Sequence, residues 1–427
     1  MARSSLRVIL PAGVAVAALT GQMVRAQEAA APDTGLKLSA QIEAGFASSF
    51  ESTPSNRLFG RLFDDQETRP VLNQALLTAA KAIDPAATGY DLGFKLQGMI
   101  GADARYTRFT NQFQGLSADS LYQIDLVEAN LQLHAPWLGE GGVDLKLGQY
   151  ATPIGAEVID PSGNPFYSHS YIFNFGIPLK HTGLLVTWHA SPLIDLYASL
   201  DTGINTGYGD GFGHAQNHGP PAFLGGFGLN LLGGDLTLLA LTHIGTEIPS
   251  AAIANGLLPP TVEPNHAYRE IGDLVTTWKA SEKLTLTNEI NWIHDDAFRA
   301  DGYGMAQYAA FALDDRISLV ARGEIFVDAE NAFVGQYGAN GDFLRAEEGL
   351  PSLSAYTVTG GPAGSRTTYG ALTIGVNYKP NLDGTPISTL IIRPELREDT
   401  ALQGLRPFHD GRDKSQTTAA IDVILGF

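Results

Sequence analysis

Apolar and polar residues alternate with a period of two along most of this chain, and no other feature constrains its fold more. The last segment shows the alternation most cleanly, because its two faces separate into a largely apolar set and a more polar set: Thr417, Ala419, Ile421, Val423, Leu425 and Phe427 against Gln416, Thr418, Ala420 and Asp422. Successive side chains of a β-strand point to opposite faces, so this period predicts strands with one apolar face. The same alternation recurs in 90–106, 316–328 and 388–397.

The pattern predicts sixteen strands distributed over the chain. Their expected ranges are 36–46, 70–82, 90–106, 121–134, 142–150, 180–190, 193–204, 222–232, 235–246, 268–280, 283–294, 303–313, 316–328, 366–378, 387–398 and 415–427. Alternation is weakest in 70–82, where Leu72 to Ile83 fits a short helix equally well. The composition agrees with a strand-rich chain, since 48 glycines suit tight turns better than long helices.

The connections between these strands alternate in length. Long connections follow the odd-numbered strands, at 51–69, 107–120, 151–179, 205–221, 247–267, 295–302, 329–365 and 399–414. Short connections follow the even-numbered strands, at 83–89, 135–141, 191–192, 233–234, 281–282, 314–315 and 379–386. Short periplasmic turns and long extracellular loops are typical of outer-membrane barrels. A soluble β-sandwich would show the same alternation within strands, but it has no reason to segregate loop lengths.

Residues 1–26 have the features of a secretory signal peptide. Arg3 and Arg7 precede a short apolar run from Val8 to Leu19, and Val24 and Ala26 suit cleavage before Gln27. The run is shorter than the roughly 20 residues that a spanning helix needs, and no later apolar run reaches that length. If the mature chain spans a membrane, it must therefore form a closed barrel.

These observations predict an all-β fold: a transmembrane, antiparallel, up-and-down β-barrel of about 16 strands, formed by residues 27–427 as a single domain. The expected location is the bacterial outer membrane, reached through the periplasm. The absence of cysteine fits a chain that crosses an oxidising compartment. A terminal Phe427 is typical of barrels assembled in that membrane, and aromatic residues near strand ends suit interfacial girdles: Tyr90, Tyr106, Trp188, Trp278, Trp292 and Tyr378.

Several short motifs resemble those of the second putative β-barrel porin family. They include the run from Gly148 to Glu157, then Asn164, Ser170, Tyr171, Pro178, and His181 to Gly183, together with Asn56, Arg57, Phe63, Asp64, Arg322 to Glu324, and Arg393 to Arg397. The resemblance covers about residues 40–427 and implies a porin-like outer-membrane barrel without implying a transported solute. The 329–365 connection is longer than this resemblance leads one to expect.

A barrel of this size can enclose a water-filled channel whose selectivity depends on its lining charges. The 151–179 connection is the best candidate for a loop that folds inward and narrows the channel. It carries Glu157, Asp160 and His169, and we expect these to face the polar rungs Arg322, Glu324, Asp328, Arg393, Glu395 and Arg397. An ordinary surface loop, with the Arg and Glu residues neutralising each other as cross-strand ion pairs within the wall, is the alternative.

The sequence thus predicts a porin for passive diffusion of small hydrophilic solutes or ions, with outer-membrane lipid around it. Analogy with sixteen-stranded porins suggests a homotrimer. A plugged structural or adhesive barrel that binds partners through acidic loops, and a soluble secreted β protein, remain alternatives. No enzyme, cofactor or metal site is expected: Ser168-His169-Ser170 has neither a nucleophile elbow around it nor an evident orienting acid, and no metal motif occurs. The net charge of −18 disfavours nucleic acid.

Overall fold

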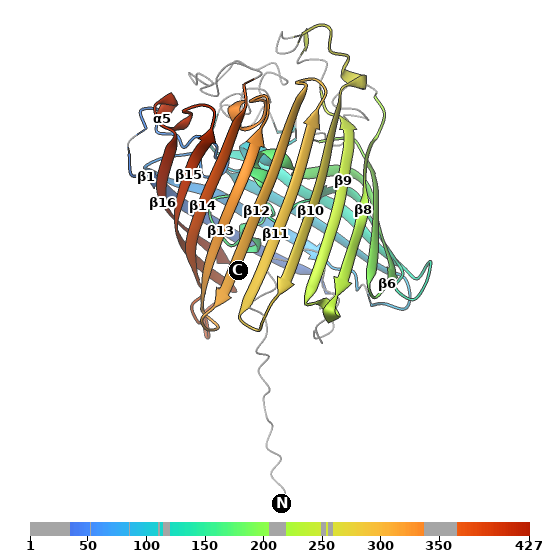
Figure 1. The fold of residues 1–427 in the computed structure, drawn as a ribbon. Coiled ribbons are helices and arrows are strands. Elements are labelled where there is room, and N and C mark those ends of the chain that lie inside the picture. The colour runs from blue at the N-terminus through green and yellow to red at the C-terminus, as the bar shows by residue number, and fades with distance from the viewer. Residues whose placement is uncertain are drawn as a thin grey trace, which may run out of the picture.

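Sixteen antiparallel strands form one closed ring (Figure 1). This computed structural model describes residues 35–51, 53–84, 86–109, 112–113, 120–204, 219–248, 253–254, 259–336 and 365–427. The strands are β1 Lys37–Ser49, β2 Pro70–Lys81, β3 Asp91–Gly101, β4 Gln123–Ala135, β5 Val143–Ala151, β6 Lys180–Ser191, β7 Ile194–Asp201, β8 Ala222–Leu231, β9 Leu236–Thr246, β10 Tyr268–Lys279, β11 Leu284–Asp295, β12 Ala300–Ala312, β13 Ile317–Asp328, β14 Thr367–Tyr378, β15 Thr389–Gln403 and β16 Ser415–Gly426. The predicted up-and-down barrel is confirmed.

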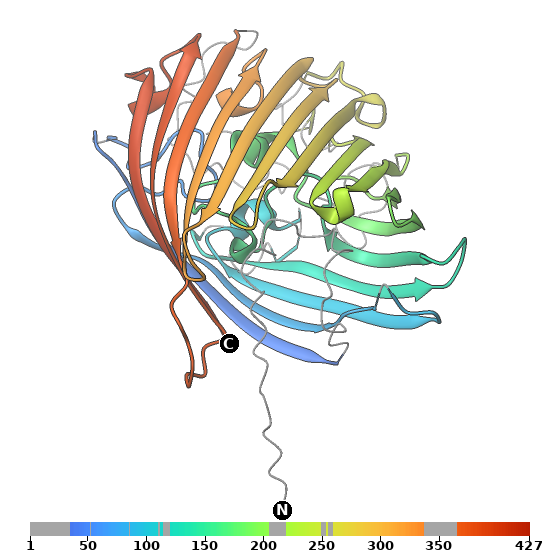
Figure 2. The ribbon, with the colours of Figure 1, turned by 60° about the horizontal axis from the view of Figure 1, so that its bottom comes forward.

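The ring closes where the first strand meets the last. β1 pairs with β16 in an antiparallel register that places Ala44 opposite Val423, and every other strand pairs with its neighbours in the sequence. Closure leaves no strand edge with unpaired backbone groups, which is what a lipid environment demands of a sheet. The C-terminal end of β16 lies at the rim that carries the short turns (Figures 1 and 2).

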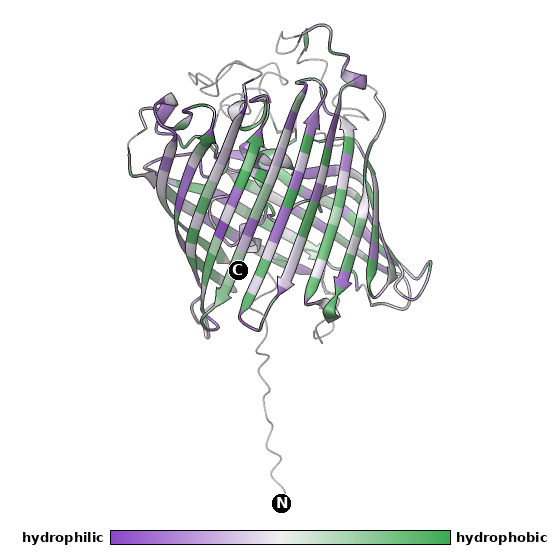
Figure 3. Ribbon diagram, viewed as in Figure 1, coloured by the Kyte–Doolittle hydropathy of each residue, from purple (hydrophilic) through white to green (hydrophobic). Residues whose placement is uncertain are grey.

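The two faces of the wall differ in the way the alternation predicts. Ile421 on β16 is 42% exposed on the outside, whereas its neighbour Asp422 is 1% exposed on the inside. Leu96 on β3 and Ile325 on β13 are likewise exposed on the outer face, while Arg322 on β13 is buried. Hydrophobic and hydrophilic residues accordingly follow each other along the strands in Figure 3. Apolar side chains facing lipid avoid the several kcal/mol that a charge costs near the membrane midplane.

Most predicted elements lie where we expected them, and even the weakest predicted strand, 70–82, is confirmed as strand β2, so the alternative of a short helix is wrong. One expectation is not met. The alternation of connection lengths has an exception, because 296–299 between β11 and β12 is shorter than the turns 82–90 and 379–388. Most of the 329–365 connection lies outside the described residues, as does the expected signal peptide.

Aromatic residues lie on the outer face near several strand ends. Tyr90, Trp278, Trp292 and Tyr378 are exposed there, as expected for interfacial girdles. Tyr106 does not belong to this group. It lies in a short helix, α1 (Ala104–Thr107), its ring packs edge-on against Phe63, and its hydroxyl contacts Asp65 at 3.3 Å.

Among the described residues, no helix is long and apolar enough to span a membrane.

Candidate functional site in the barrel lumen

The connection from β5 to β6, residues 152–179, folds into the barrel; we call it the lumen loop. Green turns of chain are visible within the ring of strands in Figure 2. Hydrogen bonds tie the loop to inward side chains on widely separated strands. Gln41 on β1 donates to Asp160 (2.8 Å), Gln74 on β2 donates to the Ile159 carbonyl (2.8 Å), and the Ala156 N–H donates to Glu289 on β11 (3.0 Å). The loop therefore crosses the lumen instead of standing above the rim.

Local sequence shapes the loop into short, self-supporting turns. The Asp160 carboxylate accepts the Ser162 N–H (3.0 Å) and caps the 3₁₀ turn Pro161–Gly163, where proline supplies the helical φ without a donor to satisfy. The Asn164 side chain closes a second turn by bonding to both the N–H and the carbonyl of Val158. A π-helical turn, Ile172–Gly176, completes the loop and is buried.

Two glycines allow the loop and the wall to approach closely. A Cβ on Gly45 of β1 would lie 2.3 Å from Tyr167 Cζ, and a Cβ on Gly176 would lie 2.4 Å from Asn291 Oδ1 on β11. Tyr167 cannot easily move away, because it is buried and its hydroxyl donates to Asn73 at 3.0 Å. Glycine is therefore required where Tyr167 meets the β1 wall.

Glu157 is the centre of the buried charge network. Arg322 Nη1 lies 2.8 Å from Glu157 Oε1, the Tyr308 hydroxyl donates to the same oxygen at 2.9 Å, and His169 Nδ1 lies 2.6 Å from Oε2. Burial raises the pKa of Glu157, but Arg322, His169 and Tyr308 together outweigh it and lower the pKa to about 2. This loop carboxylate is therefore held in its ionised form.

Two further arginines extend this network toward the extracellular side. Arg397 Nε donates to Asp399 at 2.9 Å, its Nη1 donates to the His169 carbonyl at 2.7 Å, and its Nη2 lies 3.3 Å from Glu324. Arg61, from the first connection, lies 2.7 Å from Asp64 and 2.6 Å from Asp399. Charges so deeply buried are stable only when paired, and each of these has an ion-pair partner, although Arg61 Nε and Arg397 Nη2 make no hydrogen bond in the described structure.

Arg393 and Glu395 on β15 hold the middle of the loop. Arg393 donates to the carbonyls of Pro161 and Asn164 (2.7 Å each) and to Asp422 at 3.0 Å. Glu395 accepts the backbone N–H of Tyr167 at 2.9 Å. The basic rungs predicted to face the loop thus contact its backbone directly.

The nine predicted site residues do not all meet. Glu157, His169, Arg322, Glu324 and Arg397 form one network, and Arg393 and Glu395 contact the same loop. Asp160 lies on another part of the loop and is half-buried. Asp328 lies apart, since its carboxylate accepts the N–H groups of Ala332 (2.9 Å) and Gly335 (2.8 Å) in the connection after β13. Ion pairs within the wall, as in Arg322–Glu324 (3.1 Å), occur beside those between wall and loop.

His169 has the orienting acid that the sequence did not reveal. That acid is Glu157, and the imidazole also stacks on Phe173 with ring centroids 4.1 Å apart. Within the described part of the chain, however, no serine hydroxyl is hydrogen-bonded to His169. Ser168 Oγ instead lies 3.2 Å from Arg322 Nη2, and Ser170 Oγ accepts the Phe173 N–H at 3.0 Å. The histidine is thus part of the packing of the loop and not of a nucleophile–base pair.

Apolar packing supplements the ion pairs around the loop. Ile172, Phe173 and Phe175 of the π-helical turn join a buried cluster with wall and loop residues such as Phe326 and Tyr369. Tyr171 lies 5.4 Å from Tyr369 between ring centroids and donates a hydrogen bond to Asp399 at 3.0 Å. The loop is therefore held by both polar and aromatic contacts, which favours one fixed position.

The site includes residues that sequence reasoning did not select. They are Arg61, Asp64, Glu43, Asp422, Tyr167, Tyr171 and Tyr308. Asp422 was visible as the one acid on the polar face of β16, but nothing in the sequence indicated that Arg393 is its partner. Arg61 lies in a connection without periodicity and carried no such signal.

The comparisons with known proteins agree with this architecture. The OmpF of Salmonella typhi, solved with daunomycin, superposes with a TM-score of 0.54 at 9% identity, covering 92% of this chain and 97% of that chain. An anion-selective porin from Comamonas acidovorans gives 0.53 at 10% identity, with 92% and 99% covered. The outer membrane channel DcaP of Acinetobacter baumannii gives 0.51 at 10% identity, with 92% and 97% covered. No curated protein sequence matches the chain.

A closed antiparallel ring with an apolar outer face and a polar, loop-crossed interior defines a porin-type β-barrel of the bacterial outer membrane. A location in the outer membrane excludes the alternative of a soluble secreted β protein. The profile of the family described as putative beta-barrel porin-2, OmpL-like, matches residues 35–427, and the chain belongs to that family. Family and fold together point to a channel and not to an enzyme.

Proposed function

We propose that this porin allows passive diffusion of small hydrophilic solutes or ions, and that the lumen loop narrows its channel to a charged constriction. The observation that carries the proposal is the path of the loop. Residues 156–167 bond to inward side chains on β1, β2, β11 and β15, so the loop spans the cross-section that a solute must pass. A wide barrel with such a loop inside would admit only small solutes.

The network around Glu157 would act mainly by fixing the loop. Arg322, Arg393 and Arg397 are buried and paired, so little of their charge would reach a passing solute. An acidic loop opposite a basic wall would create a transverse electric field across the channel, and at this level that field would be weak because the charges are paired. Half-exposed groups such as Asp160 would contribute more to selectivity.

A second candidate, a plugged structural or adhesive barrel that binds partners through acidic extracellular loops, is favoured by one specific observation. Eight of the nine predicted lining residues are buried, all except Asp160. Groups that line a wet passage are normally in contact with water. In this interpretation the lumen loop closes the channel, and the barrel presents its extracellular loops to binding partners.

Planar-bilayer recording of the refolded, untagged mature chain separates the two candidates. The porin proposal predicts stepwise conductance increments from the wild-type protein. Liposome swelling should then show uptake of small sugars that declines as the sugar becomes larger. Folded wild-type protein that inserts without any conductance steps would contradict the porin proposal and favour the sealed barrel.

Two expectations about the whole chain remain proposals. We infer that residues 1–26 are removed as a signal peptide, leaving 27–427 as one barrel domain, which mass spectrometry of the protein from outer membranes tests. By analogy of fold, we propose that the barrel forms a homotrimer. Native mass spectrometry from detergent tests this assembly, and a monomer alone would contradict it.

A further inference from the structure

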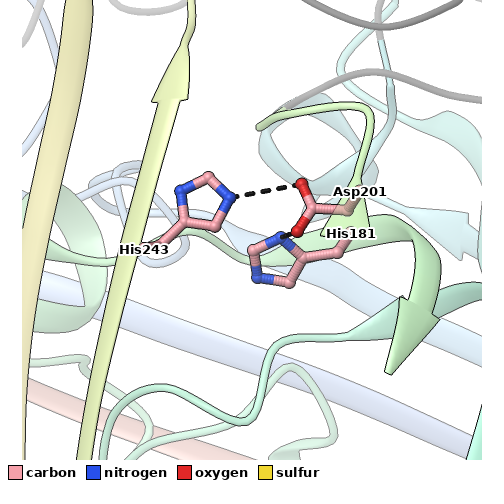
Figure 4. Close-up of side chains that lie close together, drawn as sticks. All are labelled: His181, Asp201 and His243. Carbon is pink, nitrogen blue, oxygen red and sulfur yellow. Dashed lines mark hydrogen bonds and ion pairs between the residues drawn. The ribbon is translucent and has the colours of Figure 1, made fainter. Parts of the chain in front are cut away.

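Three side chains from three strands converge inside the barrel near its extracellular rim. His181 is the second residue of β6, Asp201 is the last of β7, and His243 lies near the end of β9. Their side chains point toward one another, and the Asp201 carboxylate contacts both imidazoles (Figure 4). All three side chains are 0% exposed, which removes bulk water as a competing ligand.

The donor atoms have the separations that a metal ion would require. His243 Nε2 lies 3.2 Å from Asp201 Oδ1, His181 Nδ1 lies 3.6 Å from Asp201 Oδ2, and all three donors lie within 4.8 Å of one another. Tetrahedral Zn²⁺ with bonds of about 2.0–2.1 Å places neighbouring ligand atoms roughly 3.4 Å apart. Small side-chain rotations would bring the set onto one ion.

A buried imidazole nitrogen whose nearest acceptor lies beyond hydrogen-bond distance supports the same interpretation. His181 Nδ1 is buried and has no hydrogen-bond partner in the described structure, although its 3.6 Å approach to Asp201 points it into the cluster. A buried polar atom without a partner costs about 1–3 kcal/mol, so it needs an explanation. A bound metal ion would satisfy it.

Two of the three residues, His181 and Asp201, have outer hydrogen bonds of the kind seen around metal ligands. His181 Nε2 lies 2.9 Å from Thr152 Oγ1, Asp201 Oδ1 accepts the Gly203 N–H at 2.9 Å, and Glu247 Oε1 lies 4.0 Å from His243 Nδ1. Metal-bound imidazoles usually present their second nitrogen to a hydroxyl, carbonyl or carboxylate, which fixes ring orientation and the protonated nitrogen. His181 therefore has an outer partner of the right kind, whereas His243 Nδ1 makes no hydrogen bond in the described structure and only faces the Glu247 carboxylate.

We propose that His181, Asp201 and His243 bind one divalent transition-metal ion of the Zn²⁺ type. Two imidazoles and one carboxylate suit such an ion better than Ca²⁺ or Mg²⁺, which prefer all-oxygen ligands. The ion would join β6, β7 and β9 on the inner face of the barrel. The site is independent of the lumen loop's proposed role in diffusion.

A second His-Asp-His group in the same barrel provides a matched control. Asp144 lies between His134 (2.7 Å) and His189 (3.0 Å), but the other nitrogen of His189 lies 2.6 Å from Asp195. A carboxylate on each nitrogen favours a doubly protonated ring, which has no lone pair for a metal. This group resembles the proposed site in composition but should not bind the ion.

The test uses the full mature chain without a histidine tag, stripped with a chelator and refolded in detergent with and without Zn²⁺. After desalting, elemental analysis should find one Zn²⁺ per wild-type barrel in the protein refolded with Zn²⁺. Refolding with Co²⁺ in its place should give the d–d absorption of nitrogen and oxygen ligation. H181A, H243A and the isosteric D201N should lose the ion, while H189A should retain it. T152A, which removes the hydroxyl 2.9 Å from His181 Nε2, should weaken binding by about 10- to 100-fold.

Heat-modifiable migration on gels checks that each variant is a folded barrel. If H181A or H243A fails to fold, D201N alone decides, because it preserves the shape of the site. No Zn²⁺ on the folded wild type in either arm would overturn the proposal. Equal retention of Zn²⁺ by D201N and H189A, or equal loss from both, would overturn it as well.

Discussion

Glu157 of the lumen loop and Arg322 of β13 form a buried ion pair at 2.8 Å although 165 residues separate them in the sequence. Neither side chain is appreciably exposed, and each has further hydrogen-bond partners. The pair joins the middle of the barrel wall to the loop that crosses its interior. It is one of the buried contacts that hold the loop against the wall.

Substituting Glu157 tests that dependence. E157Q removes one partner of a buried pair, which typically costs about 3–5 kcal/mol, and Glu324 remaining beside Arg322 should keep the loss near the lower end. We expect a corresponding fall in the free energy of unfolding, measured by urea titration in detergent micelles.

E128Q is the matched control. Glu128 also faces the lumen and lies 2.7 Å from Lys95, but the lysine side chain is 31% exposed. Glu128 itself is only 9% exposed and accepts a hydrogen bond from Asn130 at 3.0 Å, but the lysine end of the pair reaches water, so E128Q should cost less stability than E157Q. Equal losses from the two variants would show that the Glu157–Arg322 pair has no special role.

The low pKa of Glu157 predicts that strong acid removes the stabilisation that its ionised carboxylate contributes. Its value falls from 4.5 in the unfolded chain to about 2, so the stabilisation is complete above pH 4.5 and is lost as the pH falls through about 2. Wild-type stability should therefore decline over this window more steeply than that of E157Q, as measured by urea titration at each pH. If the free energies of unfolding of the wild type and E157Q changed in parallel with pH, Glu157 would not be the group responsible for the decline.

The strands were predictable, and the contacts inside the lumen were not. Period-two alternation is a local property, so it identified even β2, and it sorted Asp422 from Ile421 correctly. The partners of Arg393 could not be predicted from such a local pattern. Asp422 is on the next strand, but Glu43 and the carbonyl of Asn164 come from distant parts of the chain. Only barrel closure and the inward loop bring them together, and neither leaves a local pattern.

The same reasoning explains why the sequence did not reveal the cluster of His181, Asp201 and His243. His181 and His243 lie on strands separated by two others, and each occupies an inward position of its own strand. A search for closely spaced metal motifs cannot find such a set, because the ring and its register create the neighbourhood.

Gly45 allows a steric test of the loop position. In G45A the added methyl group would collide with the buried Tyr167 ring at 2.3 Å, and overpacking of this kind costs about 1–3 kcal/mol. G323A is the control, since a Cβ on Gly323 of β13 meets no atom within 4 Å. Urea titration should show destabilisation by G45A alone, and a loop absent from the lumen would make the two variants equivalent.

The lipid-facing assignment predicts a depth-dependent cost of charge. Leu96 lies in the middle of β3 and is 51% exposed, whereas Leu92 lies near its periplasmic end on the same face. L96R should lower stability in lipid vesicles by about 2–4 kcal/mol, and L92R by about 0–1 kcal/mol. Equal effects would contradict the proposed orientation of β3 in the bilayer.

The most direct test of the account is the single-channel conductance of a variant in which residues 156–178 are replaced by a short glycine-serine link. Because the loop crosses the lumen, its removal should raise the size of each conductance step above that of the wild type, while heat-modifiable migration shows an intact barrel. Steps of unchanged size from such a folded variant would contradict the claim that the lumen loop narrows the channel.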